Sequence, residues 1–491
     1  MSRLFIGSLA ACSAIAWPGV AAAGDAQLTR AADQRVAGVD ALAARAAGKS
    51  PTAVQALYDG ARDFEEAARA ATPVSRECGA LLSASLAYAR GRVREAEGVD
   101  RPSSSITNAG RRAATSAKRR ITRARAACQG RGRGRAGRSP VMSPASEQAF
   151  YGPIVLRAPA RARTARLLVA GRPTVTRRVR RGKVRFSLDA PPGRYSLRIQ
   201  FLRGDRTVGG ARANGVRLLP ASARTVVPAT TIDAAASARA AAALTPGARF
   251  GAAWVQDLAT GTAGAANAGA RFPAASTVKL GMLASGLRRL GARPQRSPHY
   301  YDLRAMTRWS SNLATNRLLT RLGGSAFVER GLRRLGARQS TFTGGYIVGT
   351  ALQPRLPLTG VDVQPPLISR RVTTAQDLAH MLFSFTAAAA GSVQARRESG
   401  LTVQQARLGL GWMLGSEQRL ENRSLLAGGT PRGTPIAQKN GWLRAARHGA
   451  GVIFTPSGPK IAVVLTYDSG GVSTTTGRTV GARVARVAMG L

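Results

Sequence analysis

RFPAASTVKLGMLASGLRRLG, residues 271–291, is the stretch around which the second half of this 491-residue chain can be read. Its apolar spacing predicts a helix over about Ala275–Leu290, and it places Ser276 and Lys279 three residues apart, on one helical face. The chain has 73 basic residues, of which only six are lysines. Arginine effectively cannot lose its proton, whereas a buried lysine can. A lysine one turn after a serine therefore indicates a base that activates a hydroxyl.

Two later stretches carry residues of the same chemical kind. WSSNLATNRLL, residues 309–319, contains Ser310, Ser311 and Asn312. QKNGWL, residues 438–443, contains Lys439, Asn440 and Gly441 between apolar segments. Together the three stretches read S-x-x-K, S-x-N and K-x-G, in that order along the chain.

These motifs and their flanks resemble the class A β-lactamase and penicillin-binding serine hydrolase family. VQDLATG (255–261) and TTAQDLAHML (373–382) extend the resemblance, which covers roughly residues 231–491. It implies an acylated nucleophile at Ser276 and a base or proton relay at Lys279. It also implies that Ser310 passes a proton to the leaving nitrogen, while Lys439 binds the substrate carboxylate and tunes Ser310.

The resemblance also implies a set of substrate contacts. Asn312 would hold the substrate amide, and the backbone N–H groups of Ser276 and Trp442 would form the oxyanion hole. Asn440 and Gly441 lie on the same strand, and Arg447 is a further candidate for the substrate carboxylate. Asn316 matches an asparagine that braces a loop in this family.

The chain departs from the family pattern at three points. Ser311 replaces the aspartate of S-D-N, and Asn440 replaces the threonine of K-T-G. No glutamate lies between Ser340 and Val372 to activate the deacylating water, and Asp362 is the one carboxylate there. Three functions therefore stay open: a β-lactamase, a slow-turnover penicillin-binding protein or D,D-carboxypeptidase, and an inactive cell-wall-binding protein.

We expect a multidomain chain whose residues 231–491 form a serine β-lactamase-like α+β domain. Further helices are predicted over Leu303–Leu322 and Thr374–Ala389, and late strands over residues 435–443, 449–456 and 460–468. Helices between strands at both ends of the domain favour one sheet shared by its terminal segments. Alternating apolar residues predict a small β-sandwich over residues 149–228.

The first part of the chain reads differently. Residues 25–129 are Ala-rich and Arg-rich with Pro and Gly breaks, which predicts a bundle of three or four helices. Residues 130–148 have the composition of a linker. Cys78 and Cys128 are expected to form a disulfide, because an isolated pair usually bonds in an oxidising compartment.

Residues 1–23 have the pattern of an export signal, with Arg3 before an apolar run and small residues at its end. Cys12 offers a second interpretation, a lipoprotein box. The net charge of +49 indicates either an anionic partner, such as a cell-wall polymer or a membrane surface reached through the basic N-terminal half, or an arginine-rich composition bias. We expect a monomer with no nucleic-acid partner. We also expect no cofactor, and His299, His380 and His448 show no metal-binding spacing.

Overall fold

The computed structural model describes residues 25–48, 50–70, 76–100, 103–128, 142–143, 145–245, 247, 249–291, 293–346, 371–418 and 425–491. The predicted export signal, Cys12, Asp362 and most of the predicted linker lie outside these residues. The chain divides into two compact units. One consists of Met1–Gly137, Ser311–Arg317 and Gly345–Arg355, and the other of Arg138–Ser310, Leu318–Gly344 and Leu356–Leu491.

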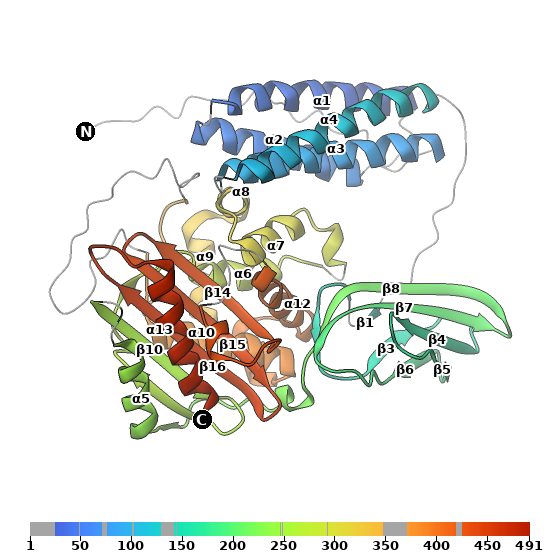
Figure 1. Cartoon of the computed structure of the whole chain (residues 1–491). Coiled ribbons are helices and arrows are strands. Elements are labelled where there is room, and N and C mark those ends of the chain that lie inside the picture. The colour runs from blue at the N-terminus through green and yellow to red at the C-terminus, as the bar shows by residue number, and fades with distance from the viewer. Residues whose placement is uncertain are drawn as a thin grey trace. The chain divides into compact units, whose positions relative to one another are not determined.

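The N-terminal region is helical, as predicted. Its described residues form helices α1 (Asp25–Ala46), α2 (Pro51–Ala70), α3 (Arg76–Asp100) and α4 (Ser104–Ala127) (Figure 1). Glycines let α3 and α4 approach closely, since a Cβ on Gly91 would lie 2.5 Å from the backbone nitrogen of Ala114. The predicted Cys78–Cys128 disulfide is present and joins the start of α3 to the end of α4. No helix among the described residues has the length and apolar character needed to cross a membrane.

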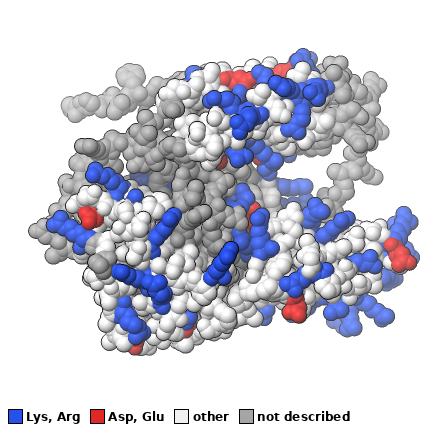
Figure 2. Space-filling view, in the orientation of Figure 1, with Lys and Arg blue, Asp and Glu red and all other residues white. Residues whose placement is uncertain are grey.

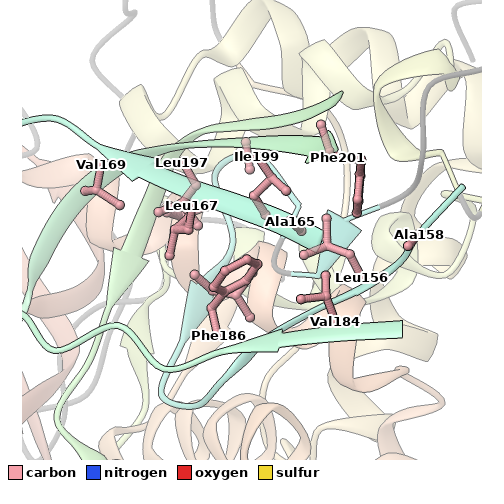
Figure 3. Close-up of a cluster of buried hydrophobic side chains, with 14 of the residues drawn as sticks. Leu156, Ala158, Ala165, Leu167, Val169, Val184, Phe186, Leu197, Ile199 and Phe201 are labelled. Atoms are coloured by element: carbon pink, nitrogen blue, oxygen red, sulfur yellow. The ribbon is translucent and has the colours of Figure 1, made fainter. Parts of the chain in front are cut away.

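Strands fill the next region, in two sheets. The three-stranded sheet has the order β1-β3-β6 and the five-stranded sheet the order β2-β8-β7-β4-β5. The strands are β1 (Met142–Ser143), β2 (Ala149–Phe150), β3 (Ile154–Arg157), β4 (Thr164–Val169), β5 (Val175–Arg178), β6 (Lys183–Phe186), β7 (Gly193–Arg203) and β8 (Arg206–Leu218). Side chains from both sheets share one buried cluster, which includes Leu156, Phe186, Leu167 and Ile199 (Figure 3). Strand β1 lies within the segment predicted as a linker.

The C-terminal region is α+β, as predicted, and its terminal segments share one six-stranded sheet. The strand order is β14-β15-β16-β10-β11-β9. The strands are β9 (Thr231–Ile232), β10 (Phe250–Asp257), β11 (Thr262–Ala266), β14 (Ile436–Leu443), β15 (Ala446–Thr455) and β16 (Gly458–Tyr467). Helices α5 (Ala234–Leu244) and α13 (Thr474–Met489) pack on this sheet around Val464, Val480 and Val484.

The region also contains helices that lie between β11 and β14 in the chain. They are α6 (Lys279–Leu287), α7 (Tyr300–Trp309), α8 (Asn312–Leu322), α9 (Gly324–Arg334), α10 (Ala375–Ala390), α11 (Val393–Ser399) and α12 (Val403–Leu414). A short ladder pairs β12 (Phe272–Pro273) with β13 (Val372–Thr373) just before Ser276.

Two helix predictions need correction. The single helix predicted over Leu303–Leu322 is broken between α7 and α8, because Ser310 has a left-handed backbone with φ 59°. The helix predicted from Ala275 begins instead at Lys279. The residues before it form tight i→i+3 turns, with the Lys279 N–H donating to the Ser276 carbonyl at 3.3 Å. Ser276 therefore lies on a turn leading into α6.

Candidate active site

The local backbone that carries Ser276 is unusual. Ala275 has φ 48°, a left-handed conformation that costs a non-glycine residue about 1 kcal/mol or more. The Thr277 hydroxyl fixes the turn by donating to the Ala274 carbonyl at 2.6 Å. Ser276 itself is half-buried, so its hydroxyl sits in a held turn at the protein surface.

Both motif lysines point at Ser310. The Lys439 ammonium donates to Ser310 Oγ at 2.8 Å and to the Asn440 carbonyl at 3.0 Å. The Lys279 ammonium donates to the Ser310 carbonyl at 2.8 Å and lies 3.4 Å from Ser310 Oγ. Lys279 and Lys439 are 1% and 2% exposed. A half-buried hydroxyl between two buried amines is arranged to exchange protons.

Burial also changes how readily one lysine holds its proton. Desolvation lowers the pKa of Lys439 to about 7. The charged form of a buried amine loses its hydration, which is the physical cause of the shift. Near neutral pH Lys439 therefore switches between an ammonium ion and a free amine.

Ser310 owes its position to the end of α7. Its N–H donates to the Ala305 carbonyl, which closes the helix in a left-handed cap. Ser311, the serine in place of the family's aspartate, accepts a hydrogen bond from the Ala314 N–H at 3.2 Å. Serine is a good N-cap residue, so this exchange keeps the start of α8 capped without a carboxylate.

Strand β14 passes directly against the Ser276 turn. A Cβ on Gly441 would lie 3.0 Å from Ala275 Cβ and Thr277 Cγ2, and 3.1 Å from the Ser276 nitrogen. A Cβ at this position would be tight enough that the strand or the turn must shift by a few tenths of an ångström. The glycine of K-N-G therefore permits this close approach of the strand and the turn, which brings the two motifs together.

The hydrogen-bonding pattern of β15 gives the direction of the Trp442 N–H. Trp442 lies opposite Arg447, whose N–H and C=O both meet the Thr466 hydroxyl of β16, at 3.3 and 2.6 Å. Antiparallel partners alternate between bonded and non-bonded pairs. Trp442 and Arg447 are thus a non-bonded pair, and the Trp442 N–H points away from β15 toward the free edge of β14.

The other predicted site residues fall into three groups. Arg447 is folded back on its own hairpin, since its guanidinium donates to the carbonyls of Leu443 and Ala446 and stacks 5.4 Å from the Trp442 ring centroid. Asn440 is buried on β14, and Asn312 is the first residue of α8 and belongs to the other compact unit. Asp362 lies outside the described residues.

Asn316 braces a loop, as expected. Its side-chain amide donates to the Tyr346 carbonyl at 2.8 Å, and its oxygen accepts from the Tyr346 N–H at 2.7 Å. Both hydrogen-bonding atoms of the amide are therefore used on one backbone residue.

His448 was not predicted to take part in the site, yet it supports the segment that leads to Ser276. Its Nε2 lies 2.9 Å from the Pro273 carbonyl, and its Nδ1 accepts from the Thr466 N–H at 3.4 Å. Burial lowers the pKa of His448 to about 4, so the ring is neutral at pH 7. A neutral ring with Nε2 protonated satisfies both contacts and ties β12 to β15 and β16.

Glu147 was also missed, and it clamps α7 from the two-sheet region. It accepts two hydrogen bonds from Arg304 Nε and one from Arg304 Nη2, at 2.7–2.9 Å, and one each at 3.0 Å from the Tyr300 hydroxyl and the Trp412 indole. Burial acts to raise the pKa of Glu147, but these bonds and the charges of Arg304 and Arg308 lower it. Glu147 is the one Asp or Glu between residues 101 and 188, a signal that the sequence offered.

Comparison with known proteins agrees with these motifs. Residues 302–490 match the sequence model of the Beta-lactamase enzyme family, a match that begins after Ser276 and Lys279. No curated protein matches the chain.

Solved structures with similarity to this chain include penicillin-binding and β-lactamase proteins. "Structure of PBP-A" is 18% identical, covering 54% of this chain and 100% of that one, with a TM-score of 0.41. The β-lactamase from Desulfarculus baarsii DSM 2075 is 20% identical, covering 52% and 97%, with a TM-score of 0.39. An ancestral class A β-lactamase (GNCA) is also 20% identical, covering 52% and 99%, with a TM-score of 0.39. The family comparison therefore shows a match to the Beta-lactamase enzyme family over residues 302–490, which include Ser310 and Lys439.

Proposed function

We propose that the C-terminal domain is a serine hydrolase of the class A β-lactamase type, which opens the β-lactam amide through an acyl-serine at Ser276. The observation that carries this proposal is the convergence of two buried lysines on Ser310, with the K-N-G strand held against the Ser276 turn. This arrangement supports a site in which Ser276 would be the nucleophile, the lysines would carry protons, and backbone N–H groups would bind the oxyanion.

In the proposed reaction the Ser276 oxygen attacks the carbonyl carbon of the β-lactam while Lys279 receives its proton. The new C–O bond forms as the C–N bond breaks, and the departing nitrogen takes a proton from Ser310. The contacts of Lys279 and Lys439 with Ser310 support this route, since a proton can pass from one amine through the hydroxyl. General acid–base steps of this kind contribute about 10²–10⁴ in rate.

Backbone N–H groups would stabilise the negative oxygen that develops during attack. We assign this role to Ser276 and Trp442, because the Trp442 N–H points to the free edge of β14 and Gly441 lies against the Ser276 nitrogen. Removing one such donor typically costs about 10²–10³ in rate. The Lys439 ammonium would bind the substrate carboxylate, with Asn440 as a further contact.

The lack of a glutamate that could activate the deacylating water favours a second candidate function. The chain has no glutamate between Ser340 and Val372, and Asp362 is proposed as a substitute base. If Asp362 does not activate water, the acyl-enzyme hydrolyses slowly. The protein is then a penicillin-binding D,D-carboxypeptidase that acts on the stem peptide of peptidoglycan.

Two reagents separate these functions. A fluorescent penicillin reports acylation, and a chromogenic cephalosporin reports turnover. Fast colour change supports a β-lactamase, while stable labelling with slow colour change supports a penicillin-binding protein. The Ser276→Ala variant should lose both signals, and Ser457→Ala, an exposed serine on a distant turn, should keep both. No labelling of the wild-type protein contradicts the proposal and leaves the inactive cell-wall-binding function.

The proposal includes export, a monomeric state, no cofactor and a chain of several domains with a small β-sandwich over residues 149–228. The Cys78–Cys128 disulfide supports an oxidising compartment. The shared core of the two sheets supports a sandwich.

A further inference from the structure

Four arginines lie on one face of the five-stranded sheet. Arg198 of β7 and Arg212 of β8 are direct cross-strand partners. Arg166 of β4 lies opposite Gln200, two residues from Arg198, and Arg178 of β5 follows two residues after the partner of Arg166. Directly opposed residues share a face, so the four form a diagonal across four adjacent strands. We name these four residues the arginine diagonal.

The arginine diagonal faces away from the core. All four side chains are exposed, whereas Ala165, Leu167, Ile199 and Ala211, neighbours of Arg166, Arg198 and Arg212 along the strands, are buried; Arg178 lies between the exposed Arg177 and the half-buried Val179. Figure 3 shows the inner face of the same strands filled by apolar side chains. Figure 2 shows how far basic residues outnumber acidic ones on the visible surface.

No fold requirement explains this arrangement. Like charges directly opposite each other destabilise an antiparallel pair, so the Arg198–Arg212 pair works against the stability of the sheet. Among the residues that the structure describes, none of the four forms an ion pair with a carboxylate within 4.0 Å. A multivalent anion lying along the diagonal would turn this repulsion into attraction.

The spacing suits a linear ligand with repeating charges. Direct cross-strand neighbours are about 5 Å apart at Cβ, and diagonal neighbours about 7–8 Å. The guanidinium groups thus follow a line of about 20 Å rather than surrounding one pocket. Arginine also binds phosphate oxygens in a bidentate manner.

The residues around the arginine diagonal argue against a nucleic acid and against a lipid membrane as its ligand. Proteins that bind single-stranded nucleic acid stack bases on aromatic side chains. Here Phe150, Phe186 and Phe201 are buried, and the half-buried Tyr195 of β7 packs against the core on the opposite face from the arginines. Membrane-surface binding uses apolar side chains inserted beside the charges. Val155 is the exposed large apolar residue of the described part of this region, and it lies on β3 of the other sheet.

We propose that the arginine diagonal binds a linear polyol-phosphate polymer, a chain of phosphodiesters without bases. The proposal does not depend on the chemistry at Ser276. It gives the two-sheet region a role as a polymer-binding module that is fixed, through Glu147, to the helix preceding Ser310.

The test uses the full chain and poly(glycerol phosphate) as the probe, with binding measured between 50 and 200 mM salt. The test variant carries four substitutions: Arg166→Gln, Arg178→Gln, Arg198→Gln and Arg212→Gln. The control variant loses the same charge from exposed arginines of α4: Arg112→Gln, Arg119→Gln, Arg120→Gln and Arg123→Gln.

Four phosphate contacts, at a slope of about 0.7 each, give wild-type binding that weakens about 50-fold over this salt range. The test variant should lose nearly all of that dependence, and the control variant should keep it. The thermal midpoint of the test variant should not fall, because the substitutions relieve repulsion. That midpoint also shows that lost binding does not reflect unfolding.

Three results would overturn the proposal. Equal losses in the two variants would show attraction by net charge alone. Single-stranded DNA that binds as tightly as the probe at equal phosphate concentration would contradict a ligand without bases. Anionic vesicles that bind more tightly than the probe, with the same loss in the test variant, would assign the face to a membrane surface.

Discussion

The protonation of Lys439 should control how fast the protein is acylated. Lys439 is 2% exposed and desolvation lowers its pKa to about 7, more than three units below an ordinary lysine. In the proposed reaction its ammonium form binds the substrate carboxylate. Below pH 7 the free protein holds this charge, and above pH 7 it loses it, so acylation should fall as pH rises.

The size of the effect follows from the pKa. The ammonium fraction drops from about 0.9 at pH 6 to about 0.1 at pH 8, so the second-order acylation constant should fall about tenfold. Lys439→Arg provides the control, because arginine keeps its charge throughout this range. Its own rate will be lower, since a guanidinium cannot reproduce the contact with Ser310 Oγ. Dividing the acylation constant of the wild type by that of the variant cancels the effect of other groups that titrate in both proteins.

The assay is the rate of labelling by a fluorescent penicillin at low concentration, which reports the free protein. The ratio of wild type to Lys439→Arg should fall about tenfold between pH 6 and pH 8. At saturating penicillin the midpoint should move upward, because a bound carboxylate stabilises the ammonium. A ratio that stays flat, or rises, refutes the role given to the Lys439 charge.

Three other predictions test the supports of the site. Gly441→Ala should slow penicillin labelling tenfold or more by pushing β14 off the Ser276 turn, whereas Gly269→Ala, which meets nothing within 4 Å, should label normally. His448 should make the unfolding free energy of the wild type, measured in urea, fall by about 2 kcal/mol between pH 7 and pH 5. The reason is that histidine in the unfolded chain takes up a proton near pH 6.5, whereas folded His448 does so only near pH 4. A His448→Leu variant whose unfolding free energy falls by the same amount contradicts this. Glu147→Ala should lower the unfolding free energy by about 3 kcal/mol and slow labelling, by leaving the Arg304 charge unpaired, while the exposed Asp205→Asn should change neither.

The motif residues could be predicted from the sequence because each motif is a short stretch with a characteristic choice and spacing of residues. One scarce lysine lies a turn after a serine and another lies two residues before a glycine, and these two lysines meet at Ser310. The strands of the C-terminal sheet were equally clear, since their apolar runs are long and separated by turns.

The supports of those residues could not be predicted, because they depend on contacts between distant segments. The left-handed backbone of Ser310 interrupts a sequence that otherwise continues a helical pattern. His448 reads as an isolated histidine until β15 places it beside the Pro273 carbonyl. Glu147 lies in a segment of linker composition, and its partners are at least 150 residues away along the chain.

The central claim, that Ser276 becomes the acylated nucleophile, is tested most directly by mass spectrometry of the intact and digested protein after incubation with benzylpenicillin. We predict a mass increase of one whole penicillin molecule, located on the peptide that contains Ser276. An adduct on any other residue, or none at all under conditions where the protein is folded, would contradict the account.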